Sequence, residues 1–355
     1  MSTIENNQAA WLTSATTKPL KVGPGPDQTK LEADEVLIQV AAVAINPSEW
    51  KFQDFAYLPV DYPHVLGSDA AGTVVQVGSG ITRFKTGDRV IGHCGGLSYG
   101  GARHGAFQNF TACREAVVAT IPDSLSFEQA VVLPLGLSTS TCGLHEVLKL
   151  RLPTVSADSA GEADSNESNE VVLIWGGSSS MGTVAVQLAA AANYKVITIA
   201  SQKNHDYVKS LAKAGSITVF DHSDPQAAGK IIDFIKSTGG KFAGAYDCIS
   251  EEKTVRACEE VVHAFGGGVI PVVLPVSEGR YDDVKFETVW ATKPGFLPGH
   301  PGAELWSKFV PKALESGVLK AKPDSLVIGH GLDKIQEAMD MQKKGVSAKK
   351  IVVTL

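Results

Sequence analysis

A strand–turn–helix pattern near the middle of the chain constrains its fold most strongly. Five successive apolar residues, from Val171 to Trp175, predict a strand buried on both faces, as in a parallel sheet. A turn of small residues follows, and an alanine-rich helical pattern begins near Met181. A second apolar run, from Lys195 to Ala200, predicts the neighbouring strand. The segment therefore predicts a β-α-β unit of an α/β fold.

The turn between the first strand and the helix has the composition of a phosphate-binding loop. It contains Gly177-x-Ser179-x-x-Gly182, a partial form of the G-x-G-x-x-G fingerprint. Amide groups at a helix N-terminus lack partners within the helix and lie at the positive end of its dipole, so they bind a pyrophosphate well. The alternative is a turn that only lets the helix pack closely on the sheet. The residues expected to bind a dinucleotide are Gly177, Ser178, Ser179, Ser180 and Met181.

The residues after the second strand indicate which dinucleotide. NAD-binding folds usually place Asp or Glu about 20 residues after the glycines, to bind the ribose hydroxyls. This chain has Ser201-Gln-Lys203-Asn204 instead. A carboxylate would repel a 2′-phosphate, whereas a hydroxyl and an ammonium can bind it. Lys203 could equally be an ordinary solvated lysine. The sequence favours NADPH over NADH, with Ser201, Lys203, Asn204 and, after the next apolar run, His222 as binding residues.

Composition and charge limit the class of protein. The chain has 355 residues, of which 44% are hydrophobic and 20% charged, as in an α/β protein large enough for two domains. A net charge of -6 argues against nucleic-acid and anionic-membrane partners. No apolar run approaches the length that spans a bilayer, and the N-terminal residues are polar. We therefore expect a cytoplasmic protein, and its five widely spaced cysteines are expected to be reduced.

The two halves of the chain have different patterns. The first half alternates short strands with turns, and the strands are expected over 35–45, 70–77 and 87–91. Residues 92–105 contain six glycines and predict a flexible loop. The acidic tract 156–170 cannot bury enough apolar surface to offset its ordering entropy, so we expect a mobile surface loop. A helix is expected over 332–344 and a closing strand over 349–355.

Several motifs are similar to those of the medium-chain dehydrogenase/reductase superfamily. Asn46-Pro-Ser-Glu-Trp-Lys51 resembles a turn of its quinone-reductase-like branch, and residues 63–74 resemble its glycine-spaced strand-turn motif. Residues 87–90 and 121–130 fit as well. The resemblance covers nearly the whole chain and is nearest to fungal zinc-type dehydrogenase-like proteins and trans-acting enoyl reductases of polyketide pathways.

The resemblance implies a two-domain α/β fold. A Rossmann-type doubly wound parallel sheet domain is joined to a β-rich GroES-like catalytic domain. Residues 1–135 and 300–355 are expected to form the GroES-like domain, and 136–299 the NADP-binding domain, which includes the acidic loop 156–170.

Two positions depart from the zinc alcohol dehydrogenases of this superfamily. Asn46 stands where those enzymes have a Cys, and Ser68 where they have a His, and neither side chain is a zinc ligand. His64 and Asp69 lie nearby, but they make a poor site without a thiolate, and His64 is expected to be structural. We expect no metal. Without that Lewis acid, hydride transfer to a carbonyl-conjugated C=C bond remains feasible, because hydrogen-bond donors can stabilise the developing enolate.

The resemblance also implies which residues lie near the nicotinamide. Lys51 could donate to a phosphate, a ribose or the substrate oxygen, or could form a salt bridge. Thr139 could orient the carboxamide or the substrate, or could only cap a helix. These two are the catalytic candidates, and Tyr99 is a weaker candidate as a proton donor. Further cofactor contacts are expected from Pro47, Ser48, Val273, Leu274 and Ser347. Substrate contacts are expected from Leu135, Leu137, Ser138, Val289, Trp290, Ala291 and Thr292.

Together these features predict an NADPH-dependent, zinc-independent oxidoreductase of fungal secondary metabolism. Its substrate would be an activated C=C bond, in a carrier-bound enoyl thioester or a small quinone or alkenal, with a polyketide synthase as partner. Two alternatives stay open, namely a zinc-free carbonyl or aldehyde reductase and a non-catalytic NADPH-binding sensor. The chain is expected to be a monomer or a homodimer. The expected edge strand of a dimer, 268–273, contains Pro271, which removes a ladder donor and favours a monomer.

Overall fold

The computed structural model describes residues 4–155 and 169–355, which fold into two compact units. Unit 1 comprises Met1–Leu135, Thr292–Pro298 and Ala321–Leu355, and unit 2 comprises Gly136–Ala291 and Gly299–Lys320. Residues 300–320 thus group with unit 2, whereas the sequence analysis expected them in the GroES-like domain. The reason is local packing, since the Trp306 indole N–H donates to Ser138 Oγ within unit 2 at 3.1 Å. The acidic tract lies outside the described residues except for its last two positions.

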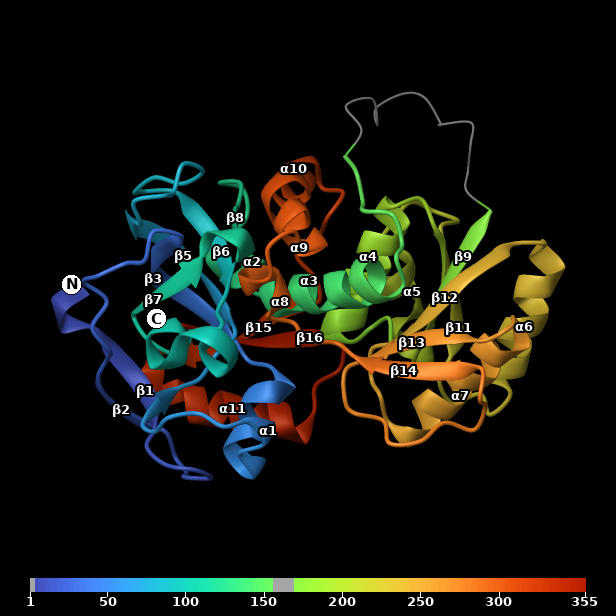
Figure 1. Ribbon diagram of the computed structural model, residues 1–355, viewed down its shortest axis with the longest axis horizontal. Coiled ribbons are helices and arrows are strands. Elements are labelled where there is room, and N and C mark those ends of the chain that lie inside the picture. Colours follow the sequence, from blue (N-terminus) through green and yellow to red (C-terminus); the bar gives the residue numbers. More distant parts are fainter. Residues whose placement is uncertain (1–3, 156–168) are drawn as a thin grey trace. The chain divides into compact units, whose positions relative to one another are not determined.

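Unit 2 is built on a sheet of six parallel strands in the order β11-β10-β9-β12-β13-β14. Figure 1 shows helices α6 and α7 beside strands of this sheet. The strands are β9 (Glu170–Trp175), β10 (Lys195–Ala200), β11 (Ile217–Asp221), β12 (Lys241–Asp247), β13 (Gly268–Val272) and β14 (Val284–Thr288). This is the strand order of a doubly wound dinucleotide-binding sheet, so the predicted Rossmann-type fold is confirmed. The order reverses beside β9, and ligands of such sheets bind at the carboxyl ends of the strands at that point.

Strand β9 is buried on both faces, as its continuous apolar run predicts. Val171, Leu173 and Trp175 share a core cluster with Ile231 and Val261, which belong to helices on one face of the sheet. The opposite face is covered by an alanine-rich helix buried along most of its length. The helices of this unit are α4 (Ser180–Ala191), α5 (His205–Lys209), α6 (Ala227–Thr238), α7 (Glu252–Ala264), α9 (Pro301–Glu304) and α10 (Val310–Ser316), with most of α3 (Pro134–Thr141) and the π-helical turns η5 (Cys142–Val147) and η7 (Leu305–Phe309).

The edge of this sheet differs from the expectation. Strand β13 was expected at the edge, but it lies between β12 and β14, and β14 forms the edge. Pro271 is tolerated in this inner position because β13 is paired with β12 only at Asp247 and Val272. Pro271 therefore gives no information about a dimer edge, and that part of the argument for a monomer is wrong.

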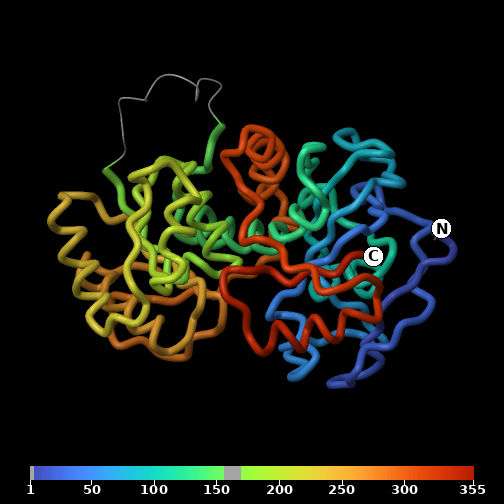
Figure 2. The backbone as a smooth tube through the Cα atoms, turned by 180° about the vertical axis from the view of Figure 1, so that it is seen from behind, coloured from blue at the N-terminus to red at the C-terminus, as the bar shows by residue number. Residues whose placement is uncertain are grey.

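Unit 1 contains a seven-stranded sheet in the order β15-β16-β3-β5-β6-β8, with β7 paired to β3. These strands are β3 (Glu35–Ala44), β5 (Asp69–Val77), β6 (Arg89–His93), β7 (Phe110–Arg114), β8 (Val118–Thr120), β15 (Asp324–His330) and β16 (Lys349–Thr354). A three-stranded sheet is formed by β2 (Lys21–Pro24), β1 (Gln8–Leu12) and β4 (His64–Val65). Helices α1 (Pro47–Phe55), α2 (Phe127–Ala130), α8 (Lys293–Phe296) and α11 (Ile335–Lys344) complete the unit. Figure 2 shows the C-terminal strand returning beside the N-terminal half, where β16 pairs antiparallel with β3.

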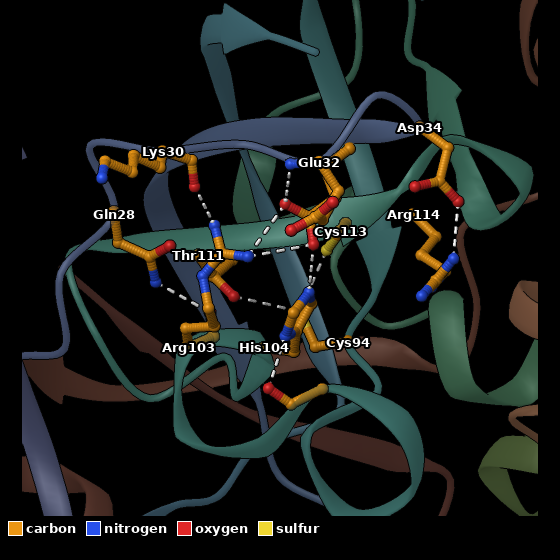
Figure 3. Close-up of polar contacts among 12 residues, drawn as sticks. Gln28, Lys30, Glu32, Asp34, Cys94, Arg103, His104, Thr111, Cys113 and Arg114 are labelled. Carbon is orange, nitrogen blue, oxygen red and sulfur yellow. Dashed lines mark hydrogen bonds and ion pairs between the residues drawn. The ribbon is translucent and has the colours of Figure 1, made fainter. Parts of the chain in front are cut away.

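The glycine-rich segment 92–105 is more ordered than the sequence suggests. It forms two short helical turns, η2 (Gly96–Gly100) and η3 (Gly101–His104). The buried Glu35 carboxylate accepts hydrogen bonds from Arg103 Nη1 at 2.9 Å and from His104 Nε2 at 2.6 Å. Figure 3 shows the Arg103 and His104 side chains of this segment and their polar contacts. A Cβ on Gly95 would lie 2.0 Å from the Tyr99 ring, so glycine is required for this close approach. The expectation of a flexible loop is therefore wrong, because buried charges anchor the segment.

The proposed proton donor Tyr99 occupies a structural position in that segment. Its ring packs 6.0 Å from the Phe296 ring and lies against the Arg114 guanidinium. Burial raises the pKa of Tyr99 well above its ordinary value. All five cysteines are free and buried. No helix in the described part of the chain is long and apolar enough to cross a bilayer.

Candidate active site

The turn after β9 forms a tight cradle at the start of α4. Ser179 is the N-cap, since its Oγ accepts the amide of Gly182 at 3.0 Å. Gly176 has a φ of +86°, which favours glycine, and a Cβ on Gly182 would lie 2.1 Å from the Gly176 carbonyl oxygen. The Gly177 amide bonds the Ile199 carbonyl at 3.0 Å, which fixes the loop against β10. The loop therefore presents the amides of the first turn of α4 at the carboxyl end of β9, and this geometry fits a pyrophosphate.

The residues expected at the 2′-phosphate lie at the same end of the sheet. Asn204 Nδ2 donates to Ser178 Oγ at 3.4 Å, so the segment after β10 contacts the phosphate loop. The His222 amide bonds the Ala200 carbonyl at 3.1 Å, which places His222 beside the start of that segment at Ser201. The Lys203 side chain is exposed there. The structure therefore brings the candidate residues after β10 and β11 to one edge.

Sequence reasoning missed Asp221, the last residue of β11. Its carboxylate accepts the amide and the hydroxyl of Ser223 at 3.0 and 2.9 Å, and it lies 3.3 Å from His222 Nδ1. The hydrogen bonds from the Ser223 backbone and side chain lower the pKa of Asp221, so the group is ionised near neutral pH. A carboxylate thus lies at the edge where none was expected. Its position directly before His222 was the available signal.

Other residues expected near the nicotinamide are placed within their own units. In unit 2, Val273 and Leu274 are half-buried after β13, and the Val273 amide donates to Ser250 Oγ at 2.8 Å. In unit 1, α1 carries Pro47, Ser48 and Lys51 in its first turns. The Ser48 hydroxyl is buried and has no hydrogen-bond partner among the described residues. Because buried polar groups normally have a partner, a bound ligand is a candidate for this one.

Two of the remaining candidates are on the surface of unit 1. Lys51 lies along α1 with its ammonium 5.7 Å from the centre of the Trp50 ring. Ser347 is exposed in the turn before β16. Both side chains can be reached by a ligand, and their expected roles stay predictions.

The expected substrate residues divide into buried and accessible ones. Leu137 and Ser138 are fully buried inside unit 2, where Ser138 Oγ accepts the Trp306 indole N–H. Substrate contact by these two residues stays a prediction, and it would require this packing to open. Thr139 is nearly buried, and its carbonyl accepts the Tyr246 hydroxyl at 3.0 Å. Leu135, Ala291 and Thr292 are partly exposed, Val289 is buried, and Trp290 is 50% exposed.

A buried ionic cluster occupies the positions of the expected zinc ligands. We call it the Lys350 cluster, and it consists of Asn46, Glu49, Ser68, Asp69 and Lys350, all of them buried. The Lys350 ammonium contacts Asn46 Oδ1 and lies 3.1 Å from Asp69 Oδ2. Asp69 Oδ2 also accepts Asn46 Nδ2 at 2.9 Å. Asp69 Oδ1 accepts the Leu135 amide at 2.6 Å, so each Asp69 oxygen has a donor.

The second carboxylate of the cluster is Glu49. It accepts hydrogen bonds from the Asn46 amide at 2.6 Å and from the Ser68 hydroxyl at 2.9 Å. Burial and the nearby Asp69 charge raise the pKa of Glu49 to about 7. Burial also lowers the pKa of His93, at the end of β6, to about 4, so its ring is neutral at pH 7. The cluster thus combines the Lys350 amine with two carboxyl groups, of which Glu49 has a raised pKa.

These residues do not fit a catalytic zinc. Zinc sites use thiolate, imidazole and carboxylate ligands, whereas positions 46 and 68 supply an amide and a hydroxyl. The Lys350 ammonium already lies between Asn46 and Asp69, and its positive charge would repel a second cation there. His64 packs in β4 with its ring 6.4 Å from the Phe52 ring. Burial lowers the pKa of His64. The structural role expected for His64 stays a prediction, and its Nε2 atom is buried without a hydrogen-bond partner among the described residues.

Comparisons with known proteins agree with this geometry. The model of the alcohol dehydrogenase GroES-like domain matches residues 32–123. A trans-enoyl reductase of Aspergillus japonicus, himH, is 43% identical over 349 residues, which cover 98% of this chain and 97% of that protein. The enoyl reductase component of the lovastatin nonaketide synthase of Aspergillus terreus, lovC, is 34% identical. The alignment covers 92% of this chain and 90% of that protein.

The solved structures give the same fold. An alcohol dehydrogenase superfamily protein from Novosphingobium aromaticivorans matches with a TM-score of 0.77, covering 98% of this chain and 99% of that one at 24% identity. A likeness at this identity concerns the fold alone, and the assignment to a family comes from the full-length relatives. The chain belongs to the medium-chain dehydrogenase/reductase superfamily, in the branch that contains the trans-enoyl reductases.

Proposed function

We propose that this protein is an NADPH-dependent, zinc-independent reductase of C=C bonds conjugated with a carbonyl group. Its substrate would be an enoyl thioester attached to the carrier domain of a polyketide synthase. The names of two full-length relatives support this substrate class, since one is a trans-enoyl reductase and the other the enoyl reductase component of a synthase. The family relationship supports a nicotinamide cofactor in the cradle of unit 2.

The Lys350 cluster is the observation that carries the proposal. An alcohol dehydrogenase with zinc uses the metal to polarise a carbonyl or alkoxide oxygen. Here the corresponding residues hold an ammonium that is already neutralised by Asp69. An unconjugated carbonyl would therefore lack its electrophilic catalyst. A conjugated C=C bond needs less help, because the charge that follows hydride addition spreads to the carbonyl oxygen as an enolate.

The chain's own residues would bind and orient the reactants. When bound, NADPH supplies a hydride to the β-carbon. The amides at the start of α4 would hold its pyrophosphate, and Ser201, Lys203 and His222 its 2′-phosphate. The buried Ser48 hydroxyl would receive a hydrogen bond from, or donate one to, the ribose or the substrate. Lys51 and Thr139 are the candidates for donation to the enolate oxygen, and water would protonate the α-carbon.

An isotope experiment tests this reaction. NADPH deuterated at the transferred C4 position is incubated with a 2-enoyl N-acetylcysteamine thioester, and the product is examined by NMR. We expect deuterium on the β-carbon and, in D2O with unlabelled NADPH, deuterium on the α-carbon. Turnover of unconjugated aldehydes or ketones alone would favour a carbonyl reductase. Failure to oxidise NADPH with any acceptor, carrier-bound enoyl chains included, would favour a sensor.

The proposal also covers the compartment, the oligomeric state and the partner of the protein. We infer a cytoplasmic protein, either monomeric or homodimeric, that meets a polyketide synthase while the acyl chain is still on the carrier domain. Turnover of a carrier-bound enoyl chain should then exceed turnover of the same chain on N-acetylcysteamine. Equal kcat/KM for the two would mean that the carrier contributes no binding and would contradict a synthase partner.

A further inference from the structure

Three side chains of unit 2 that take no part in the proposed function converge beside its surface. Cys142 and Glu146 lie four residues apart on the π-helical turn η5, and His300 precedes α9. His300 Nε2 lies 3.7 Å from Cys142 Sγ and 3.3 Å from Glu146 Oε2. Cys142 is fully buried and His300 nearly so. π-helical turns inside α-helices are frequent at functional sites, which directs attention to this cluster.

The tautomer of His300 decides what the cluster can do. The Gly302 amide donates to His300 Nδ1 at 2.9 Å as the N-cap of α9. Because a backbone amide is always a donor, Nδ1 accepts and the ring proton lies on Nε2. That N–H faces Glu146 and Cys142. Thiolate, imidazole and carboxylate are zinc ligands, and these three donors lie within 4.8 Å of one another. Metal binding at Nε2 would require the ring proton to move to Nδ1, where it would oppose the Gly302 N–H group. The three side chains therefore form a hydrogen-bonded cluster and not a metal site.

The thiol of this cluster holds the backbone of Trp290. Cys142 Sγ donates to the Trp290 carbonyl at 3.3 Å, and His300 Nε2 lies 3.7 Å from the same sulfur. The Trp290 side chain is half-exposed, which is unusual for a large aromatic residue. A fixed backbone under an exposed indole gives a rigid apolar surface for a ligand.

We propose that Cys142, oriented by His300, is a positioning residue that fixes Trp290 as the contact for the apolar chain of the substrate. This inference rests on the proposed function, because it assigns the substrate's acyl chain to Trp290. The contact acts through the backbone, so it would set the affinity for the substrate and leave the hydride transfer step unchanged.

The test compares Cys142→Ala with Cys142→Ser and with a matched control. Cys258→Ala removes another fully buried thiol of the same unit, on α7. With a 2-octenoyl N-acetylcysteamine thioester, Cys142→Ala should raise KM about 2- to 10-fold, the range for a lost hydrogen bond, with kcat and NADPH affinity nearly unchanged. Cys142→Ser keeps a donor and should restore KM. Cys258→Ala should leave KM as in the parent protein.

A second measurement does not depend on turnover. Hydrogen exchange of the peptide that spans 289–300 should be faster in Cys142→Ala and unchanged in Cys142→Ser and Cys258→Ala. If the parent protein does not reduce the thioester, the proposed function fails, and the exchange data still decide whether Cys142 holds this segment. Equal effects of the two alanine variants would overturn the positioning role. A stoichiometric thiolate-to-Co²⁺ charge-transfer band lost in Cys142→Ala would overturn it in favour of a metal site.

Discussion

Lys350 Nζ lies 3.1 Å from Asp69 Oδ2, and both side chains are almost completely removed from solvent. The lysine comes from the last strand of unit 1 and the aspartate from the start of β5. Their charges therefore neutralise each other in a place where neither could be solvated. A complete buried ion pair of this kind has a small net effect on the free energy of unfolding. Removing one partner destabilises the fold strongly, because the other charge is left buried alone.

Lys350→Met should strongly destabilise unit 1. The substitution leaves the Asp69 charge buried without its counter-ion, and we expect a loss of about 3–5 kcal/mol in the free energy of unfolding, measured with urea. Lys349→Met is the matched control, since Lys349 pairs with Asp324 at 3.1 Å with both side chains about half-exposed. That control should lose about 0–1 kcal/mol. Equal losses in the two variants would contradict the assignment of a buried ion pair.

Glu35 should make the protein sensitive to acid. Burial opposes its charge, but the hydrogen bonds from His104 and the Glu32 amide lower the pKa of Glu35 from 4.5 to about 2. A lowered folded-state pKa stabilises the fold above pH 4.5, and that stability is lost as the pH falls from 4.5 towards 2. The linkage corresponds to about 3 kcal/mol. Glu35→Gln should be less stable at pH 7 and should show a flatter decline in stability below pH 4.5, followed by urea unfolding. An unchanged slope would refute the prediction.

Glu49 should have the opposite dependence on pH. Its pKa is raised from 4.5 to about 7, so it binds a proton more tightly in the folded protein than in the unfolded chain. Its contribution to stability is complete below pH 4.5 and is lost as the pH rises through 7. In Glu49→Gln this decline should disappear from the curve of unfolding free energy against pH. The comparison uses slopes, so a constant loss from altered hydrogen bonds does not affect it. A decline that persists in the variant would exclude Glu49 as its source.

Lys203 should discriminate between the two nicotinamide cofactors. Lys203→Ala removes a charge-assisted hydrogen bond to the 2′-phosphate, so NADPH should bind about tenfold more weakly by calorimetric titration. NADH affinity should hardly change. Lys209→Ala removes an exposed lysine from the end of α5 and serves as the control.

A substitution of Asp221 provides a second test of the proposed 2′-phosphate site. Asp221→Asn removes a negative charge next to His222 and should tighten NADPH binding. Equal affinity of the parent protein for NADPH and NADH would rule out the whole assignment of the 2′-phosphate site.

Activity should be independent of zinc. Metal analysis of the purified protein should find well below one zinc per chain, and dialysis against a chelator should leave turnover of an enoyl thioester unchanged. The physical reason is the set of side chains in the Lys350 cluster, in which the ammonium contacts the Asn46 amide oxygen and the Ser68 hydroxyl donates to Glu49. A stoichiometric zinc whose removal abolishes turnover would contradict this.

Local patterns predicted the nucleotide-binding unit well, because its features depend on neighbouring residues. The apolar run of β9, the small-residue turn and α4 are each encoded in a few consecutive positions. The Lys350 cluster could not be predicted in this way. In the sequence, Lys349-Lys350 looks like an ordinary solvated pair. Only the register of β16 on β3, with Val352 opposite Ala44, brings Lys350 to Asn46.

The errors have the same origin. The glycines that suggested a flexible loop lie within segment 92–105 itself. The carboxylate that anchors the segment, Glu35, is about 70 residues away in the sequence. The burial of Ser138 likewise depends on a distant residue, since Trp306 donates to its hydroxyl from 168 residues away. Contacts between distant segments carry no local signal, and the sequence alone could not place them.

The position of Lys350 in the chain also has a consequence for biosynthesis. Asp69 and Glu49 emerge from the ribosome early, but their ammonium belongs to residue 350 and cannot arrive until unit 2 has been translated. Until then the first 135 residues lack β16 and contain two carboxylates without a counter-charge. Burial of Asp69 in the nascent N-terminal segment is therefore unfavourable until residue 350 has been translated and pairs with it.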